Sequence, residues 1–320
     1  MAGAVEEIWT EKYRPRKLDD IIGQRHIVER LKHFVGKKSI PHMLFAGPAG
    51  IGKTTAALAM ANELYGESWQ GNFLELNSSD ERGIDTIRVK VKEFARTIPI
   101  NGSFKIIYLD EADSLTRDAQ HALRRTMENY AHICRFILAC NYSGKIIPPI
   151  QSRCAVFRFS ALGEKDVIDC VAAIAKKEKL SIDDKALKVI FSSADGDMRK
   201  AINILQMASS SKKITEDIVY SVTSRADPEE VRKMLDLALK GQFPPARQML
   251  SDLMYQKGLS GEDIIKEMHS QVMNLSVIDT QKLEIIERIG EYEFRLTEGS
   301  NPQIQLEALL AQVALIGRRQ

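Results

Sequence analysis

Residues 47–54 constrain what this chain can fold into more than any other stretch. They run Gly-Pro-Ala-Gly-Ile-Gly-Lys-Thr and fit the phosphate-loop pattern G-x-x-x-x-G-K-[ST] at every fixed position. The apolar run at 43–46 before them predicts a buried strand, and residues 54–61 after them are rich in helix formers. A strand, a glycine loop and a helix are the context in which this pattern binds a nucleotide, so a glycine-rich turn without chemical meaning is the weaker interpretation.

The loop pattern predicts a role for several of its residues. Its glycines let backbone N–H groups face a polyphosphate at the start of a helix, where the helix dipole also favours negative charge. Lys53 is predicted to reach the β- and γ-phosphates of ATP, and Thr54 to bind a Mg2+ ion. The nucleotide-binding residues predicted in this stretch are Gly47, Pro48, Ala49, Gly50, Ile51, Gly52, Lys53, Thr54 and Thr55.

A second chemical signature follows the apolar run at 104–109, which ends abruptly in Asp110-Glu111-Ala112-Asp113. In phosphate-loop enzymes an acid at the tip of a neighbouring strand holds the magnesium ion, and the next glutamate can polarise the attacking water. We therefore predict that Asp110 binds the metal and that Glu111 is catalytic, rather than that both are surface acids at a strand end. The same four letters occur in DEAD-box helicases, but the remaining chain is too short for their second domain.

Apolar runs and helical patterns alternate along the first half of the chain. The predicted strands number five, at 43–46, 72–77, 104–109, 134–140 and 155–159. The other helices predicted among them lie at 24–35, 84–97 and 117–129. This alternation predicts an α/β fold with a five-stranded, doubly wound parallel sheet.

Ligand sites on such sheets collect at the carboxyl ends of the strands, where the glycine loop, the acid pair and Asn141 all fall. The Asn141 side-chain amide could orient a water or contact a γ-phosphate. An asparagine that only ends a strand in a turn is the commoner case, and both interpretations stay open on this pattern alone.

The strand pattern ends after residue 160. Short amphipathic helices are predicted at 164–179, 182–194, 197–209 and 215–223, which together indicate a small helical lid. Asp195-Gly196-Asp197 predicts a helix-capping turn. Arg199 lies in the first turn of the helix that follows, which is unfavourable for the helix dipole, so it is a candidate for another task.

The remainder is predicted to be helical throughout, with breaks at Gly241, 243–245, 258–261 and 299–302. It contains no chemical motif and is interpreted as a packing or oligomerisation surface. Three domains are therefore predicted, at 1–160, 161–225 and 226–320.

An aromatic and basic segment, Trp9-Thr10-Glu11-Lys12-Tyr13-Arg14-Pro15-Arg16, precedes the first helix. It predicts an extended arm that packs over a flat ligand such as adenine. An arm that only packs on the domain surface is an equal alternative. The helix predicted at 84–97 mixes cations and acids, which alone is typical of a solvated face.

Composition adds limits rather than a function. The chain has 320 residues, 44% hydrophobic and 28% charged, which is typical of a soluble globular protein of two or three domains. A formal net charge of +2 argues neither for nor against nucleic acid. Four cysteines at irregular spacing disfavour a zinc site or a disulfide framework. We find no signal peptide and no run of about 18 apolar residues, so we expect a protein inside the cell and away from membranes.

Taken together, the motifs resemble those of the replication factor C small subunits, the clamp loaders of archaea and eukaryotes, and are most similar to the archaeal form. The resemblance covers essentially the whole chain. The stretches that carry it are 9–15, 77–84, 110–113, 122–128 and Gln151-Ser152-Arg153-Cys154.

This resemblance implies an AAA+ P-loop ATPase core, a helical lid and an all-α collar, in subunits arranged as a pentameric spiral that binds ATP and Mg2+. It implies that ATP binding and hydrolysis open a ring-shaped sliding clamp (PCNA) and load it onto primer–template DNA during replication. The implied partners are the clamp, a large subunit, other small subunits and DNA. The implied location is the archaeal cytoplasm at the nucleoid, or the nucleus if the source is eukaryotic.

Catalytic roles also follow from the resemblance. Arg153 resembles the arginine finger that enters the neighbouring subunit's site, where a cation would stabilise charge on the transferring phosphate. Asn141 resembles the first sensor of the family and Arg199 the second.

Further residues resemble the family's ligand contacts. Tyr13, Arg14 and residues 20–22, which include Ile22, resemble the positions that lie against adenine in this family. The positions that follow the DNA backbone through phosphate contacts are Arg82, Arg88 and Lys145. The loop departs from the family at Ala49 and Ile51, where Pro and Thr are common; we expect nucleotide binding to survive, and the effect on turnover stays open.

Three other classes share part of this pattern. A branch-migration helicase would have the loop and the acids, but the Ser-Arg-Cys motif and a helical C-terminal part without a winged helix argue against it. A scaffold subunit that does not hydrolyse ATP would lack Lys53, Glu111 or Arg153. A small-molecule kinase would need neither a finger from a neighbour nor a collar.

Overall fold

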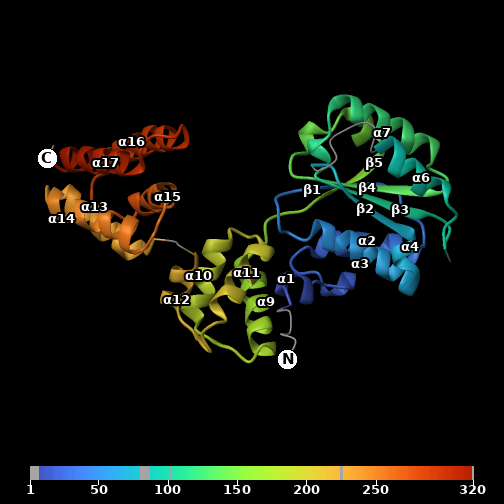
Figure 1. Cartoon of the computed structure of the whole chain (residues 1–320), viewed down its shortest axis with the longest axis horizontal. Helices are drawn as coiled ribbons and strands as arrows, with labels where there is room; N and C mark the ends of the chain where they lie inside the picture. The colour runs from blue at the N-terminus through green and yellow to red at the C-terminus, as the bar shows by residue number, and fades with distance from the viewer. Residues whose placement is uncertain (1–6, 80–86, 101, 224–225, 319–320) are drawn as a thin grey trace, which may run out of the picture. The chain divides into compact units, whose positions relative to one another are not determined.

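The computed structural model describes residues 7–79, 87–100, 102–223 and 226–318 (Figure 1). It divides into two compact units, one ending at Lys213 and the other beginning at Ile214. No helix in the described ranges is long and apolar enough to span a bilayer.

The first unit is built around a five-stranded parallel sheet in the order β2-β3-β4-β1-β5. The strands are β1 His42–Ala46, β2 Phe73–Asn77, β3 Lys105–Asp110, β4 Cys134–Cys140 and β5 Cys154–Arg158. β1 lies between β4 and β5, with Leu44 opposite Leu138 on one side and Val156 on the other. This confirms the predicted doubly wound sheet, whose central strands are apolar because helices bury both of their faces.

Helices cover the two faces of the sheet, with α2 Arg25–Gly36 and α3 Lys53–Tyr65 on one and α7 Arg117–Asn129 on the other (Figure 1). Alternate residues of β1 follow this division. Met43 and Phe45 belong to the apolar cluster that contains residues of α2 and α3, whereas Leu44 and Ala46 belong to the cluster that contains residues of α7. The parallel arrangement brings the carboxyl ends of β1, β3 and β4 to one edge.

Helices of the predicted lid follow the sheet. They are α9 Glu164–Lys177, α10 Asp184–Ala194 and α11 Met198–Ala208, which pack on one another. The predicted capping turn is confirmed, since Asp197 accepts the N–H of Lys200 at 3.0 Å. Two short paired strands, β6 Ser181–Ile182 and β7 Lys213–Ile214, were not predicted.

The second unit is helical. After α12 Glu216–Thr223 its helices are α13 Pro228–Leu239, α14 Phe243–Ser251, α15 Gly261–Val272, α16 Asp279–Thr297 and α17 Pro302–Gly317. The predicted break at 243–245 is wrong, because its prolines form the first turn of α14, where proline has no N–H to lose. A break between Val272 and Asp279 was not predicted.

The prediction of an extended arm at residues 9–16 is also wrong in part. Residues Trp9–Lys12 form the short helix α1, and Pro15 follows soon after it. Other short elements were not predicted; they are η1 Leu18–Asp20, η2 Gly66–Ser68, α4 Trp69–Asn72, η4 Ala112–Ser114, η5 Ser143–Lys145 and α8 Pro148–Gln151. The π-helix η6 Asp252–Gln256 lies in the part that was predicted to be helical. The helix predicted at 84–97 is described from residue 87, as the π-helix η3 Ile87–Val91 and then α6 Lys92–Arg96.

Candidate active site

The glycine loop connects β1 to α3, and its backbone has a positive φ at three glycines, Gly47, Gly50 and Gly52. Gly52, directly before α3, has φ +98°, and Gly50 has φ +67°, in the region that side chains disfavour. A Cβ built at Gly50 would also lie 1.7 Å from Asp197 Oδ1. The Met198 N–H donates to the Gly50 carbonyl at 3.1 Å. The first turn of α11 in the lid therefore rests directly on the loop.

Lys53 is the central cation of this site. Its Nζ donates to the carbonyl oxygens of Gly47 and Pro48, both at 2.6 Å, and to Asn141 Oδ1 at 3.1 Å. Burial lowers the pKa of Lys53, while the nearby Asp110 carboxylate acts in the opposite direction. The ammonium group thus joins the loop to the end of β4, and Asn141 does more than terminate a strand.

A second set of contacts joins α3 to the end of β3. Thr54 Oγ1 donates to Asp110 Oδ2 at 3.1 Å and lies 2.9 Å from Tyr108 Oη. The two predicted metal-binding residues are therefore within hydrogen-bond distance of each other. Glu111 follows in a left-handed conformation, φ +51° and ψ +39°, which is uncommon for glutamate and is a form of backbone strain that clusters at functional sites.

Asp113 has a positioning contact that the sequence interpretation did not anticipate. Its Oδ2 accepts the backbone N–H groups of Asn141, at 3.3 Å, and of Tyr142, at 3.1 Å. The carboxylate thereby fixes the backbone that presents the Asn141 amide to Lys53. The available signal was a second acid just beyond the β3 tip, next to a strand that ends in asparagine.

One pocket collects most of the predicted nucleotide-binding and catalytic residues. Those that line it are Tyr13, Arg14, Ile22, Ala49, Gly50, Ile51, Gly52, Lys53, Thr54, Thr55, Asp110, Glu111, Asn141 and Arg199. Gly47 and Pro48 contribute their carbonyl oxygens to Lys53 but do not line it. Thr10 and Pro15 of the predicted arm and Ile21 of the predicted adenine wall also line it, and the lining residues that were not predicted are Leu162, Cys170, Met198 and Ile202.

The pocket suits an anion at the glycine loop and a cation beside the Asp110 carboxylate. Backbone N–H groups at the start of α3 and the Lys53 ammonium suit a polyphosphate. Within the described ranges, no group of three or more His, Cys, Asp or Glu side chains could hold a metal by itself. A metal here would need oxygen atoms from a bound ligand, as Mg2+ does in phosphate-loop enzymes.

Three family models match parts of this chain. Residues 43–162 match the ATPase family associated with various cellular activities (AAA), residues 169–210 match the RCF1/5-like AAA+ ATPase lid domain, and residues 226–312 match the replication factor C C-terminal domain. The replication factor C small subunit of Methanococcus maripaludis is 55% identical over 98% of this chain and 100% of that protein. That of Sulfurisphaera tokodaii is 56% identical over 98% of this chain and 97% of its own length.

The chain belongs to the replication factor C small-subunit family. Solved structures of the Thermotoga maritima RuvB Holliday junction branch migration motor are similar at a TM-score of 0.56 and 20% identity, over 80% of this chain and 91% of that one. This likeness shows a shared AAA+ fold and nothing about function.

Arg153 lies outside the pocket of its own chain, between α8 and β5. Its Nη2 lies 2.5 Å from Glu128 Oε1, and its Nη1 donates to the Pro149 carbonyl at 2.6 Å. The side chain is 38% exposed. The residue that resembles the family's finger is thus a surface cation held by the end of α7.

The three residues that resemble DNA contacts of the family are only partly described. Lys145 is exposed, with its Nζ 5.0 Å from the ring centroid of the exposed Tyr142. Arg82 and the side chain of Arg88 lie outside the described residues. Their predicted role in following the DNA backbone stays a prediction.

Proposed function

We propose that this chain is an ATPase subunit of a clamp loader, which uses ATP binding and hydrolysis to open a sliding clamp (PCNA) and load it onto primer–template DNA. One observation carries the proposal: Lys53, Thr54, Asp110 and Asn141 meet at one edge of the sheet, in a chain about 55% identical to replication factor C small subunits over nearly its full length. The partners in this proposal are the clamp, a large subunit, other small subunits and DNA.

The residues of the pocket fit ATP and Mg2+. The loop backbone and Lys53 suit the phosphates, and the Thr54 hydroxyl and Asp110 carboxylate, 3.1 Å apart, are hard oxygen ligands of the kind that Mg2+ prefers. When bound, Mg2+ would neutralise charge on the phosphate oxygens. Tyr13, Arg14 and Ile22 would form the wall against adenine.

Each catalytic side chain then has a distinct task in this proposal. The Glu111 carboxylate would orient the attacking water and accept its proton. Lys53, Asn141 and Arg199 would contact the phosphates from three different elements, and Arg153 would enter a neighbouring subunit's pocket as a finger. The location of Arg153 outside its own pocket supports that last assignment.

The remaining assignments follow the family. We propose an ATPase core at 1–160, a lid at 161–225 and an oligomerisation collar at 226–320, with Arg82, Arg88 and Lys145 along the DNA backbone. Because the relatives are named as replication factors, we place the chain where DNA is replicated, in the archaeal cytoplasm at the nucleoid or, for a eukaryotic source, in the nucleus.

The test is ATP hydrolysis by the chain assembled with its large subunit, measured with and without sliding clamp and primed DNA. We expect the clamp and primed DNA together to stimulate hydrolysis, and we expect Lys53→Ala to abolish nucleotide binding and hydrolysis. A rate of hydrolysis that the clamp does not change, together with movement of the protein along DNA, would instead indicate a branch-migration motor. A chain that binds no ATP would contradict the proposal.

A further inference from the structure

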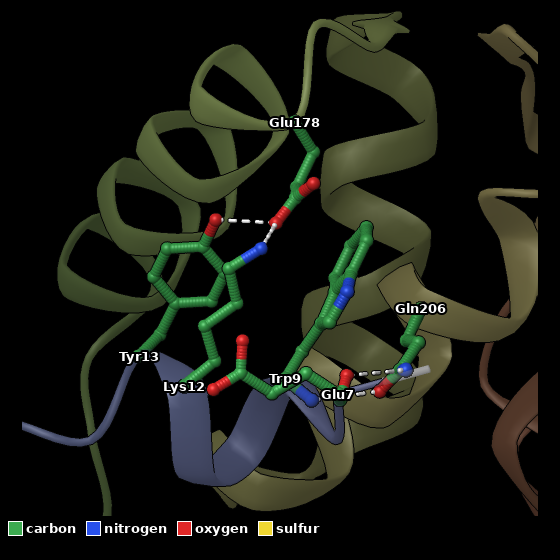
Figure 2. Close-up of polar contacts among 6 residues, drawn as sticks. All are labelled: Glu7, Trp9, Lys12, Tyr13, Glu178 and Gln206. Atoms are coloured by element: carbon green, nitrogen blue, oxygen red, sulfur yellow. Dashed lines mark hydrogen bonds and ion pairs between the residues drawn. The ribbon is translucent and has the colours of Figure 1, made fainter. Parts of the chain in front are cut away.

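Two lid helices hold the N-terminal arm, residues 7–17, by polar contacts at two separate points (Figure 2). Directly after α9, one carboxylate oxygen of Glu178, Oε1, accepts both from Tyr13 Oη, at 2.5 Å, and from Lys12 Nζ, at 2.6 Å. On α11, Gln206 Oε1 accepts the Trp9 backbone N–H at 3.0 Å. Its amide nitrogen donates to the Glu7 carbonyl at 3.3 Å.

Aromatic contacts complete the same junction. Trp9 is a buried residue, 8% exposed, and its ring meets the Tyr13 ring edge-on, at 6.3 Å between ring centroids. Lys177, at the end of α9, has its Nζ 5.5 Å from the Tyr13 ring centroid. The Tyr13 ring is thus bounded by Trp9 from the arm and by Lys177 from the lid.

The position of this arm sets the shape of the nucleotide pocket. Tyr13 and Arg14 from the arm and Met198 and Ile202 from the lid line the same pocket. If the arm left the lid, the pocket would lose one wall while the loop and the acid pair stayed intact. A contact that fixes the arm on the lid therefore acts on ligand binding from outside the pocket.

We propose that Glu178 is a positioning residue that holds the arm on the lid, so that Tyr13 and Arg14 stand as a wall of the nucleotide pocket. This inference rests on the proposed nucleotide-binding function. Glu178 does not line the pocket, and among the residues that the structure describes its side chain contacts Tyr13 and Lys12, through which it would act.

The character of the contact favours positioning over a contribution to global stability. The Lys12 and Glu178 side chains are 37% and 20% exposed, and ion pairs with such exposure contribute little to stability. The hydrogen bonds from Lys12 and Tyr13 lower the pKa of Glu178, so the carboxylate stays charged around neutral pH. Two donors from one turn of the arm converge on that single charge, which fixes the arm's orientation.

The chain offers its own reporter of arm docking. It has two tryptophans, and Trp69→Phe leaves Trp9, in the arm, as the only indole. In this background, quenching of Trp9 fluorescence by acrylamide is measured on the full chain without nucleotide. We expect Glu178→Gln, which keeps the oxygen but removes its charge, to increase the quenching constant. Asp169→Asn, an exposed acid on α9, is the matched control and should leave it unchanged.

The second readout is nucleotide affinity. We expect Glu178→Gln to weaken Mg-ADP binding, measured by calorimetry, by roughly three- to tenfold, because a charge-assisted contact of the arm is lost. The effect should fall on the KM for ATP rather than on kcat. Tyr13→Phe should weaken Mg-ADP binding as well. The fold-loss of affinity in the double variant should be smaller than the product of the two single fold-losses, because both substitutions remove the same contact.

The outcomes separate this inference from the proposed function. A wild-type chain that binds no ADP contradicts the proposed function, whereas Trp9 quenching tests the arm contact without any nucleotide. Unchanged quenching in Glu178→Gln would overturn the inference. So would increased quenching with unchanged ADP affinity, because the arm would then be released without consequence for the pocket.

Discussion

His42 begins strand β1, which lies between β4 and β5, and is held there as a neutral imidazole. Its Nδ1 accepts the backbone N–H of Phe136 at 3.0 Å. Burial lowers the pKa of His42 to about 4, and the nearby Arg135 guanidinium acts in the same direction. Protonation would remove the acceptor for the Phe136 N–H, so the charge state of this one side chain is linked to the folding of the sheet that carries the loop.

A pH dependence of stability follows at this residue. Between pH 6.5 and about 4 the unfolded imidazole binds a proton that the folded one does not, so stability is lost as the pH falls through this interval. We expect this one group to contribute a slope of up to about 1.4 kcal/mol per pH unit. Urea unfolding at pH 7, 6 and 5 measures it.

The matched variant is His42→Asn, whose Oδ1 can accept the same N–H but does not titrate. We expect its stability to fall less steeply than that of the wild type between pH 6.5 and 5. Parallel slopes for the two chains would show that the imidazole does not titrate in this interval on unfolding.

At the same scale, the clustering of Lys53, Thr54, Asp110 and Asn141 was predictable because the carboxyl ends of parallel strands share one edge. The contacts of Asp113 and Glu178 were not. Asp113 meets Tyr142 29 residues away, and Glu178 meets Tyr13 165 residues away. No local spacing encodes such pairs, because they depend on how the elements pack.

At the scale of elements, prediction succeeded where one physical cause dominated. The strands β1, β3 and β4 are largely buried apolar runs, and β4 covers the residues predicted for it, 134–140. Predictions of secondary structure were wrong where a tertiary contact, or the position of a residue within a helix, decided the local conformation. Helix α1 has four residues and is held partly by Gln206, and Pro244 and Pro245 start a helix rather than break one.

Close packing of α17 on α13 leads to a prediction at this scale. A Cβ built at Gly317 would lie 2.0 Å from the Leu239 carbonyl oxygen. Because this oxygen belongs to the backbone of α13, it cannot move aside as a flexible side chain could. We expect Gly317→Ala to lower the free energy of unfolding by about 2–3 kcal/mol, as measured by urea denaturation.

Gly290 in α16 is the matched control, because a Cβ there would meet nothing within 4 Å. We expect Gly290→Ala to raise stability by about 0.5–1 kcal/mol, since alanine is the better helix former. Equal effects of the two substitutions would contradict close contact between α13 and α17.

At the scale of the whole molecule, function in this account depends on a neighbour. With a formal net charge of +2, the chain has little overall attraction for DNA, so phosphate contacts would come from local cations in an assembly. Arg153 is paired with Glu128 outside its own pocket. It would have to exchange this partner for a neighbour's phosphates, and each pocket would be complete only between two subunits.

The central claim is that the loop and the finger of one catalytic site come from different chains. Lys53→Ala removes the loop cation and leaves the finger, whereas Arg153→Ala removes the finger and leaves the loop. We expect each variant, assembled separately with the large subunit, sliding clamp and primed DNA, to lose nearly all stimulated ATP hydrolysis.

The decisive measurement is ATP hydrolysis by assemblies formed from an equal mixture of the two variants. Random mixing would pair an intact loop with an intact finger at about a quarter of the head-to-tail interfaces between small subunits. We expect hydrolysis to reappear in the mixture. Hydrolysis no higher than the mean of the two separate variants, or wild-type turnover by Arg153→Ala alone, would contradict it.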